Sequence, residues 1–156
     1  MSRTHRSAIS YIDKSRDYYA AQGYSQPYKW AANDDAPFSP LPRPLDECRV
    51  GIVTTTKRNA DDPLEPYAAP ADPQPAAMAT DHLHWHQDAT HTNDVGSFLP
   101  LDHLRTLAAE GRIGSVSPRY YSVSTIYSQR RTLTWAEQVR EWAEEDRIDV
   151  MVLVPL

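Results

Sequence analysis

Cysteine is almost absent from this chain of 156 residues. With a single thiol, Cys48, the chain cannot form an internal disulfide framework, a zinc site of four thiolates or a dithiol redox couple. Cys48 precedes a predicted strand, at the end opposite to the one where α/β folds place their sites. We therefore interpret it as a small buried hydrophobic side chain.

Long apolar runs and a surplus of positive charge are also missing. The longest apolar run, Val150 to Leu156, is far shorter than the roughly 20 residues that span a bilayer. The first residues lack the apolar stretch of a secretion signal. The formal net charge is −5, and no basic face offers the phosphate contacts on which nucleic-acid binding depends. We expect a cytoplasmic protein that binds neither membranes nor nucleic acid.

Glycine is scarce and proline is abundant, with five Gly against thirteen Pro. Most of the prolines lie between Pro27 and Pro75, and such a stretch favours irregular structure. Residues 1–47 are predicted to form one short helix, over 7–22, and an irregular Pro-rich arm that wraps the core. The length allows one hydrophobic core, so 1–156 is predicted to be a single domain with its α/β core in 48–156.

The core contains alternating strand and helix signals. Apolar, β-branched segments predict strands at 49–54, 113–117 and 148–154, and amphipathic segments predict helices at 100–110 and 134–145. Thr134 and Glu137 fit a capping box at the start of the second helix. Residues 59–79 are predicted to be a loop, in which any strand would lie at a sheet edge. We expect a three-layer α/β domain with a short, mostly parallel sheet that is open or incomplete.

Five of the six histidines lie between His82 and His103. His82, His84 and His86 alternate, so they would share one face of an extended strand, and imidazole is a ligand for Zn, Fe, Ni and Cu. Such side chains are about 6 to 7 Å apart, too far to converge on one ion without a kink. A metal site of His82, His84, His86 and His91 is the alternative to a simple polar, solvent-facing segment.

Two further segments contain candidates for catalysis and substrate binding. The spacing of His91 and Asp94 allows the carboxylate to orient the imidazole for proton transfer. Arg119, followed by Tyr120, is expected at the carboxyl end of a strand, where parallel α/β folds bind ligands. A guanidinium there would hold a carboxylate through two hydrogen bonds. The alternative role for Arg119 is an ion pair with a nearby acid.

Thr55 and Thr56 follow another predicted strand and offer hydroxyl and amide groups to a substrate. The next residues, from Lys57 to Ala60, contain none of the glycines that a phosphate-binding loop needs. We therefore exclude a nucleotide-binding loop here and keep Thr55 and Thr56 as candidate substrate-binding residues.

Four segments, taken in order, resemble a known family. They are RVGIVTTT at 49–56, ATHTND at 89–94, the long block at 96–119 and IDVMVLVPL at 148–156. They are similar in order and spacing to the selenoprotein B family of glycine, sarcosine and betaine reductases and to the related D-proline reductase subunit. The most specific part is Phe98 to Arg119, and the resemblance covers most of the chain.

The resemblance implies an oxidoreductase. In that family the last strand runs directly into a motif with selenocysteine or cysteine, and a further α/β half follows. We therefore expect such a residue after Leu156, as when an in-frame UGA codon is taken for a stop, and no other cofactor or metal. His91, Asp94 and Arg119 match the family pattern, which implies a proton-donor pair and a contact with an acidic group.

On this basis the chain is predicted to be the substrate-binding portion of a thiol- or selenol-dependent reductase, inactive in isolation. The expected substrate is small and acidic or amino-acid-like, and the expected assembly is an oligomer formed with a partner subunit or with itself. Two alternatives are a metal-dependent hydrolase or lyase built on the histidine cluster and a non-catalytic interaction subunit.

Overall fold

The computed structural model describes residues 11–26, 35, 39–84, 88–126 and 128–156. The chain divides into two units, Met1–Pro37 and Phe38–Leu156. The first contains helix α1, Tyr11–Ala21, which ends before Gly23 at a φ of +86°, a conformation that glycine adopts readily after a helix. The helix predicted over 7–22 is therefore present, although residues 7–10 lie outside the described part of the chain.

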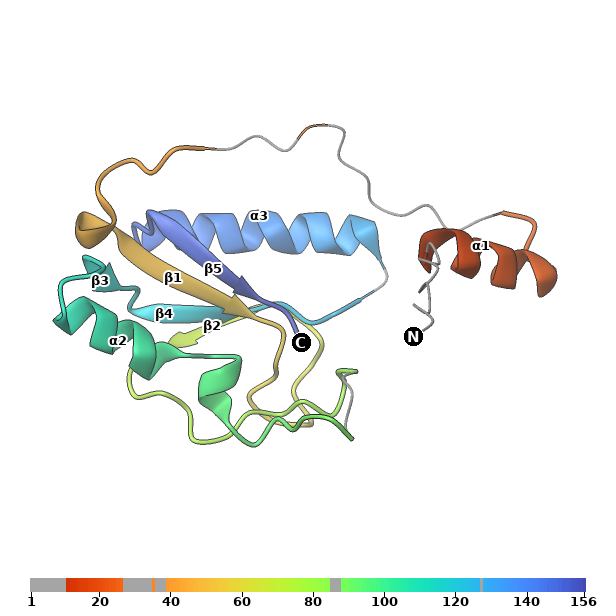
Figure 1. Cartoon of the computed structure of the whole chain (residues 1–156), viewed down its shortest axis with the longest axis horizontal. Helices are drawn as coiled ribbons and strands as arrows, with labels where there is room; N and C mark the ends of the chain where they lie inside the picture. Colours follow the sequence, from red (N-terminus) through yellow and green to blue (C-terminus); the bar gives the residue numbers. More distant parts are fainter. Residues whose placement is uncertain (1–10, 27–34, 36–38, 85–87, 127) are drawn as a thin grey trace, which may run out of the picture. The chain divides into compact units, whose positions relative to one another are not determined.

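The second unit is built on a five-stranded sheet (Figure 1). Its strands are β1 (Arg49–Thr54), β2 (Tyr67–Pro70), β3 (Ser115–Val116), β4 (Arg119–Ser122) and β5 (Val150–Val154). β1 pairs in parallel with β3, β4 and β5, and β2 pairs antiparallel with β4. Val50 of β1 pairs with residues of both β3 and β5, and Thr54 with residues of both β4 and β5. Consequently, β3 and β4 lie along one side of β1 and β5 lies along the other.

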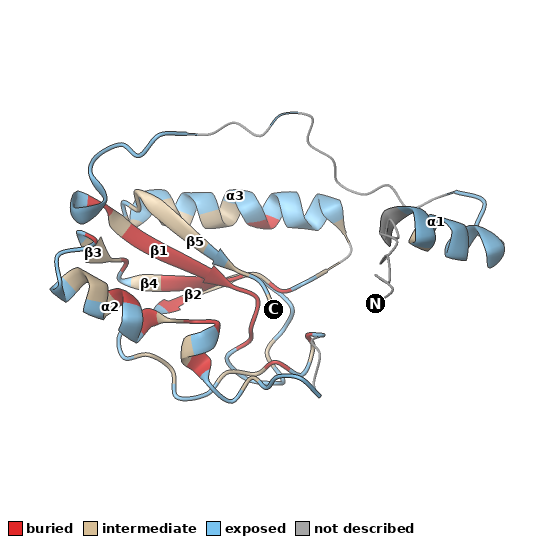
Figure 2. Ribbon diagram, in the orientation of Figure 1, coloured by how far each residue is buried: buried red, intermediate tan, exposed pale blue. Residues whose placement is uncertain are grey.

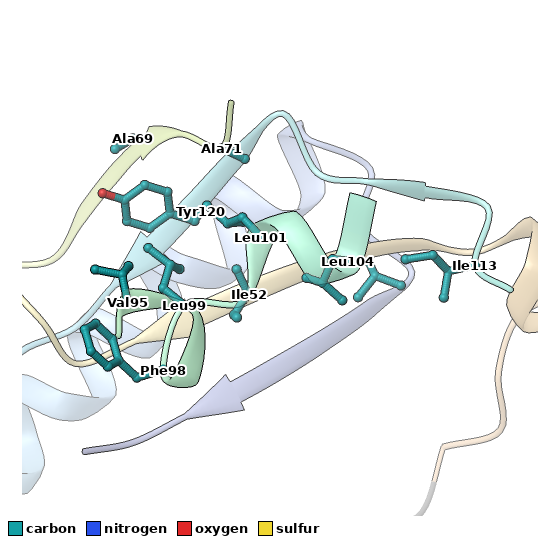
Figure 3. Close-up of a cluster of buried hydrophobic side chains, with 11 residues drawn as sticks. Ile52, Ala69, Ala71, Val95, Phe98, Leu99, Leu101, Leu104, Ile113 and Tyr120 are labelled. Carbon is teal, nitrogen blue, oxygen red and sulfur yellow. The ribbon is translucent and has the colours of Figure 1, made fainter. Parts of the chain in front are cut away.

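Helices cover the two faces of this sheet, with α2 (Leu101–Ala109) on one face and α3 (Gln129–Glu145) on the other (Figure 1). Two short 3-10 helices, η1 (Leu45–Glu47) and η2 (Val95–Ser97), complete the elements. The main core lies on the α2 face, where Ile52 and Tyr120 of the sheet pack with Leu99, Leu101 and other apolar side chains (Figure 3). The predicted α/β class with a short, open, mostly parallel sheet is confirmed.

β5 forms an edge of the sheet, because among the described strands it pairs with β1 alone. Val150, Val152 and Val154 pack against the core, whereas Leu153, on the other side of the strand, is 71% exposed. Figure 2 shows the contrast with β1, which is mostly buried. The edge that the sequence predicts is therefore open in this chain.

The start of α3 corrects the predicted capping box. Helix α3 begins five residues before Thr134, and its N-cap is Ser128, whose side chain accepts a hydrogen bond from the amide of Arg131 at 3.4 Å. The Thr134 hydroxyl instead donates to the carbonyl of Arg130 at 3.2 Å, within the helix. The residues between Ser128 and Thr134 are mostly polar and lack the repeated apolar positions of an amphipathic helix. A prediction based on such positions therefore begins the helix too late.

Two strand predictions also change. The strand predicted over 113–117 is limited to β3, and the chain then forms β4 instead of leaving the sheet. The segment 59–79, predicted to be a loop, contains β2, which lies at the sheet edge, where a proline-containing strand was expected. Among the described residues, no helix is long and apolar enough to cross a membrane.

Candidate functional site

Buried polar side chains gather where β1 and β4 end. Thr54, Thr55, Thr56 and Lys57 are all buried, although the chain has left β1 after the first of them. Three more buried hydroxyl groups lie at the end of β4, just after it, or in the loop that pairs with Lys57, and they belong to Ser122, Ser124 and Thr80. Polar groups are buried when they have hydrogen-bond partners or a function. We call this set the strand-end cluster.

Thr56 lies at the centre of the cluster and is fully buried. Its carbonyl accepts hydrogen bonds from the hydroxyl of Tyr67, at 3.2 Å, and from the hydroxyl of Ser122. Its own hydroxyl lies 3.5 Å from that of Thr54. Burial raises the pKa of the Tyr67 phenol well above its usual value, so this hydroxyl stays protonated and donates. Thr56, predicted to bind substrate, is therefore enclosed by the protein.

Thr55 joins the cluster to the last strand. Its hydroxyl accepts a hydrogen bond from the backbone amide of Leu156 at 3.0 Å. Its carbonyl lies 3.0 Å from Nε2 of His82, and because a carbonyl can only accept, Nε2 carries the proton. The end of β5 and the imidazole of His82 therefore meet at one residue.

Lys57 is a buried cation beside Thr55. Its backbone exchanges two hydrogen bonds with Ala79, at 3.1 and 2.9 Å, which hold the loop before His82 against the end of β1. The ammonium donates to the carbonyl of Ala60 and lies 3.8 Å from a carboxylate oxygen of Asp81. The sequence indicated Lys57 as part of the loop after the strand but not as a site residue.

His91 and Asp94 lie in the loop that precedes η2, and both are exposed. Nδ1 of His91 accepts from the amide of Asn93 at 3.4 Å, whereas the Asp94 carboxylate accepts from the amide of Gly96 at 2.9 Å and caps η2. Within the described part of the chain, no hydrogen bond joins the two side chains. The loop is nevertheless tied to the strand-end cluster, because the hydroxyl of Thr92 lies 2.9 Å from that of Thr80.

Arg119 does not lie at a carboxyl end of the sheet, because it is the first residue of β4. Its guanidinium donates to Asp146 at 2.8 Å and to Glu145 at 2.9 Å, at the carboxyl end of α3. The hydrogen bond to Asp146, followed by that to Glu145, raises the pKa of Arg119 further above its usual value. The alternative role, an ion pair with a nearby acid, describes this position better than a substrate clamp.

Tyr120 and Tyr121 point to opposite faces of the sheet, as neighbours on a strand do. Tyr120, predicted to bind substrate, belongs to the main core, with its hydroxyl 3.9 Å from the sulfur of Met78. Tyr121 packs beside Trp142 of α3, with ring centroids 5.7 Å apart. Its hydroxyl donates to Asp146, at 2.6 Å. The two tyrosines therefore join the sheet to the main core on one face and to α3 on the other.

Among the histidines that the structure describes, none lies on a strand. His82 is half-buried and bonded to Thr55, His84 and His91 are exposed, and His86 lies outside the described residues. Across the part of the chain that the structure describes, no group of three or more His, Cys, Asp or Glu side chains could hold a metal ion. Cys48 is fully buried just before the amino end of β1, far along that strand from the strand-end cluster.

Besides Lys57, other members of the site could not be found from the sequence. Ser122 and Ser124 were not singled out, because a short hydroxylic segment after an aromatic pair has no periodic signal of its own. His82 was considered only as a metal ligand. Comparison with protein-family models, with curated proteins and with solved structures finds no match to this chain.

Proposed function

We propose that this chain is the substrate-binding portion of a thiol- or selenol-dependent reductase of the glycine, betaine and D-proline reductase type. The first support is the sequence resemblance in 49–56, 89–94, 96–119 and 148–156. The observation that carries the proposal is the hydrogen bond from the amide of Leu156 to the hydroxyl of Thr55, at 3.0 Å. A reactive residue placed after Leu156 would enter the strand-end cluster directly.

The chemistry of such a reductase requires a nucleophile with a low pKa, and a thiolate or selenolate meets this need. Cys48 is buried before the opposite end of β1, so it does not fill this role. In the proposal, the reactive residue follows β5 and His91 donates a proton to the product. The Asp94 carboxylate, bound to the amide of Gly96, holds the loop in place.

The direct test is the nucleotide sequence immediately downstream of the codon of Leu156. A TGA triplet followed in frame by a cysteine-containing motif is the expected result, because selenocysteine is encoded by TGA. A TAA or TAG triplet, or a downstream frame without cysteine, would contradict the proposal.

A biochemical test uses the gene extended through the downstream frame, with a cysteine codon in place of the TGA. Alkylation by iodoacetamide should be fast below pH 7, since a thiol in such a site ionises more readily than a free thiol. The chain that ends at Leu156 is the matched control, because its buried Cys48 should react slowly. Equal alkylation rates in the two proteins would count against a reactive position after β5.

A further inference from the structure

Among the described strands, none lies beside the outer edge of β3. β3 and β4 follow each other along the same side of β1, but β2 pairs with β4 and not with β3. The chain leaves the sheet after Pro70, and the amide of Ala71 donates to the carbonyl of Pro118 at 2.9 Å. The position beside β3 that would continue β2 is therefore open in the described part of the chain.

Val116 has an unpaired backbone on this edge. The amide of Ser115 donates to the carbonyl of Cys48 at 3.2 Å. The amide of Ser117 donates to the carbonyl of Val50 at 2.8 Å, so both amides face β1. Because successive residues of a strand turn their backbone groups to opposite sides, the N–H and C=O of Val116 point away from β1. No described residue forms a hydrogen bond with either group, which leaves one donor and one acceptor at the edge.

A cavity of about 480 Å³ lies at the same edge. Its largely apolar walls include Val116 of β3, Ala71 after β2, and Ala108 and Arg105 of α2. Cavities of roughly 300–1,000 Å³ with apolar walls and a few polar groups are typical binding sites. Val116 packs against the main core, on the α2 face of the sheet. A side chain placed beside Val116 on that face would therefore enter the cavity.

The rim of the cavity has more negative than positive charge. The guanidinium of Arg105 donates to the carbonyl of Ala71 at 2.6 Å and to the carboxylate of Asp102. It also lies 3.7 Å from the carboxylate of Asp72. The two carboxylates are 67% and 82% exposed, respectively. One cation therefore faces two exposed anions, and this rim favours a basic partner over an acidic one.

We propose that an extended basic peptide segment of a partner protein adds to the sheet beside β3. One apolar residue of the segment lies opposite Val116 and exchanges two backbone hydrogen bonds with it, in the antiparallel orientation that β2 has beside β4. Its side chain enters the cavity, because residues directly opposite each other share a face. Basic side chains two positions away point to that face as well, towards Asp72 and Asp102.

This surface is distinct from the strand-end cluster. β3 pairs with Arg49 and Val50 at the amino end of β1, whereas the strand-end cluster lies where β1 ends. Binding of the peptide segment is therefore independent of the proposed reductase chemistry.

The experiment is an NMR titration of the ¹⁵N-labelled chain with the capped peptide Lys-Thr-Leu-Thr-Lys. The expected result is saturable shifts at Ala108, Val116 and Ser117. Replacing the peptide Leu by Ala should weaken binding by about tenfold or more, because the cavity is no longer filled. N-methylation of the Leu amide should weaken binding by about three- to tenfold, because the hydrogen bond to the carbonyl of Val116 is lost. Replacing both peptide Lys residues by Glu should weaken it by about fivefold or more.

Two variants of the chain test the same contacts. Val116→Pro removes an amide that no described residue uses, and a strand edge accepts proline when the lost N–H faces away from the neighbouring strand. This variant should bind the peptide about three- to tenfold more weakly. Asp72→Asn should weaken binding by about two- to fivefold, because an exposed ion pair is lost. Asp61→Asn is the matched control and should leave binding unchanged, since Asp61 is exposed and does not line the cavity.

Any one of four results would overturn the inference. The first is the absence of saturable binding to the wild-type chain, and the second is equal affinity for the N-methylated and unmodified peptides. The third is an equal effect of Asp72→Asn and Asp61→Asn. The fourth is a set of shifts confined to β5, which would place the peptide at the other edge of the sheet. Because Asp72 is exposed, Asp72→Asn is expected to fold and to give a result even if Val116→Pro does not.

Discussion

The hydroxyl of Thr55 accepts a hydrogen bond from the amide of Leu156, a residue 101 positions later in the chain. The first and last strands of the core thus end at the same point, and they pair in parallel from Val50 to Thr54 of β1. Because the carbonyl of Thr55 also accepts from His82, one threonine fixes two segments at the strand-end cluster. A substitution at Thr55 should therefore first affect the structure at the end of β5.

Replacing Thr55 by Val removes the acceptor for the Leu156 amide and keeps the shape of the side chain. We expect faster hydrogen exchange at Leu156 and a loss of about 0.5–1.5 kcal/mol in the free energy of unfolding. Thr55→Ser keeps the hydroxyl and is the matched control. If the Leu156 amide exchanges equally fast in both variants, the side-chain hydrogen bond does not hold the end of β5.

Arg119 is predicted to act on stability and not on ligand binding. Its partner Asp146 is only 10% exposed and also accepts from the hydroxyl of Tyr121. Arg119→Ala would leave that carboxylate without its cation, so we expect a loss of about 3 kcal/mol on urea unfolding. Arg140→Ala is the control, because its pairs with Glu137 and Glu144 are exposed and exposed ion pairs contribute little to stability. Equal losses would argue against a structural role for Arg119.

Asp146 should also give the domain a pH dependence. Burial acts to raise the pKa of its carboxyl, but hydrogen bonds from Arg119 and Tyr121 and the charges of Arg119 and Arg49 outweigh it, so the pKa lies below its usual value. A pKa that is lower in the folded state stabilises the fold above the unfolded value, about 3.9, and the benefit is lost as the pH falls through the folded value.

The measurement compares wild type with Asp146→Asn across pH. We expect the wild-type chain to be more stable at pH 7 and the difference in unfolding free energy to shrink as the pH falls below about 4. Other carboxylates titrate in both proteins, so the difference isolates Asp146. A gap that stays constant down to pH 2 would show that this carboxyl does not titrate with folding.

The strands β1 and β5 and the helix α2 could be predicted from the sequence because burial gives them a strong pattern. β1 and β5 contain continuous apolar runs, and α2 repeats Leu101, Leu104 and Leu107 on one face. The candidate site was less predictable. Arg119 was placed at a strand end because the break between β3 and β4 looked like the start of a loop, and its ion pair depends on Asp146, which is 27 residues away. Contacts of this kind leave no local signal.

The start of α3 was also placed incorrectly from the local sequence pattern, and its true position can be tested directly. Ser128 caps the helix, and Thr134 lies inside it. Ser128→Ala should therefore cost about 1 kcal/mol of stability, and Thr134→Ala should cost little, because alanine is the better helix former. Thermal or urea unfolding of the two variants measures both values. A larger loss of stability in Thr134→Ala than in Ser128→Ala would indicate that the helix begins at Thr134.

The open edge at β5 predicts how the isolated chain associates. Its five residues, Val150 to Val154, contain neither a charge nor a proline, two of the features that commonly protect an edge strand. Leu153 is 71% exposed on that strand. We therefore propose that the chain self-associates or binds a partner subunit through this edge, and we expect Leu153→Lys to lower its association and its binding of an apolar dye.

Light scattering at several protein concentrations measures the association, with Leu133→Lys as the matched control. Leu133 is 69% exposed but lies on α3, away from the strand edge. The edge is the cause if Leu153→Lys shifts the equilibrium towards monomer and Leu133→Lys does not. A wild-type chain that is monomeric and binds no dye would contradict the prediction, and equal effects of the two variants would assign the association to general hydrophobicity. A lysine on β5 blocks pairing without removing a core contact, so the unfolding free energy should change by less than about 0.5 kcal/mol.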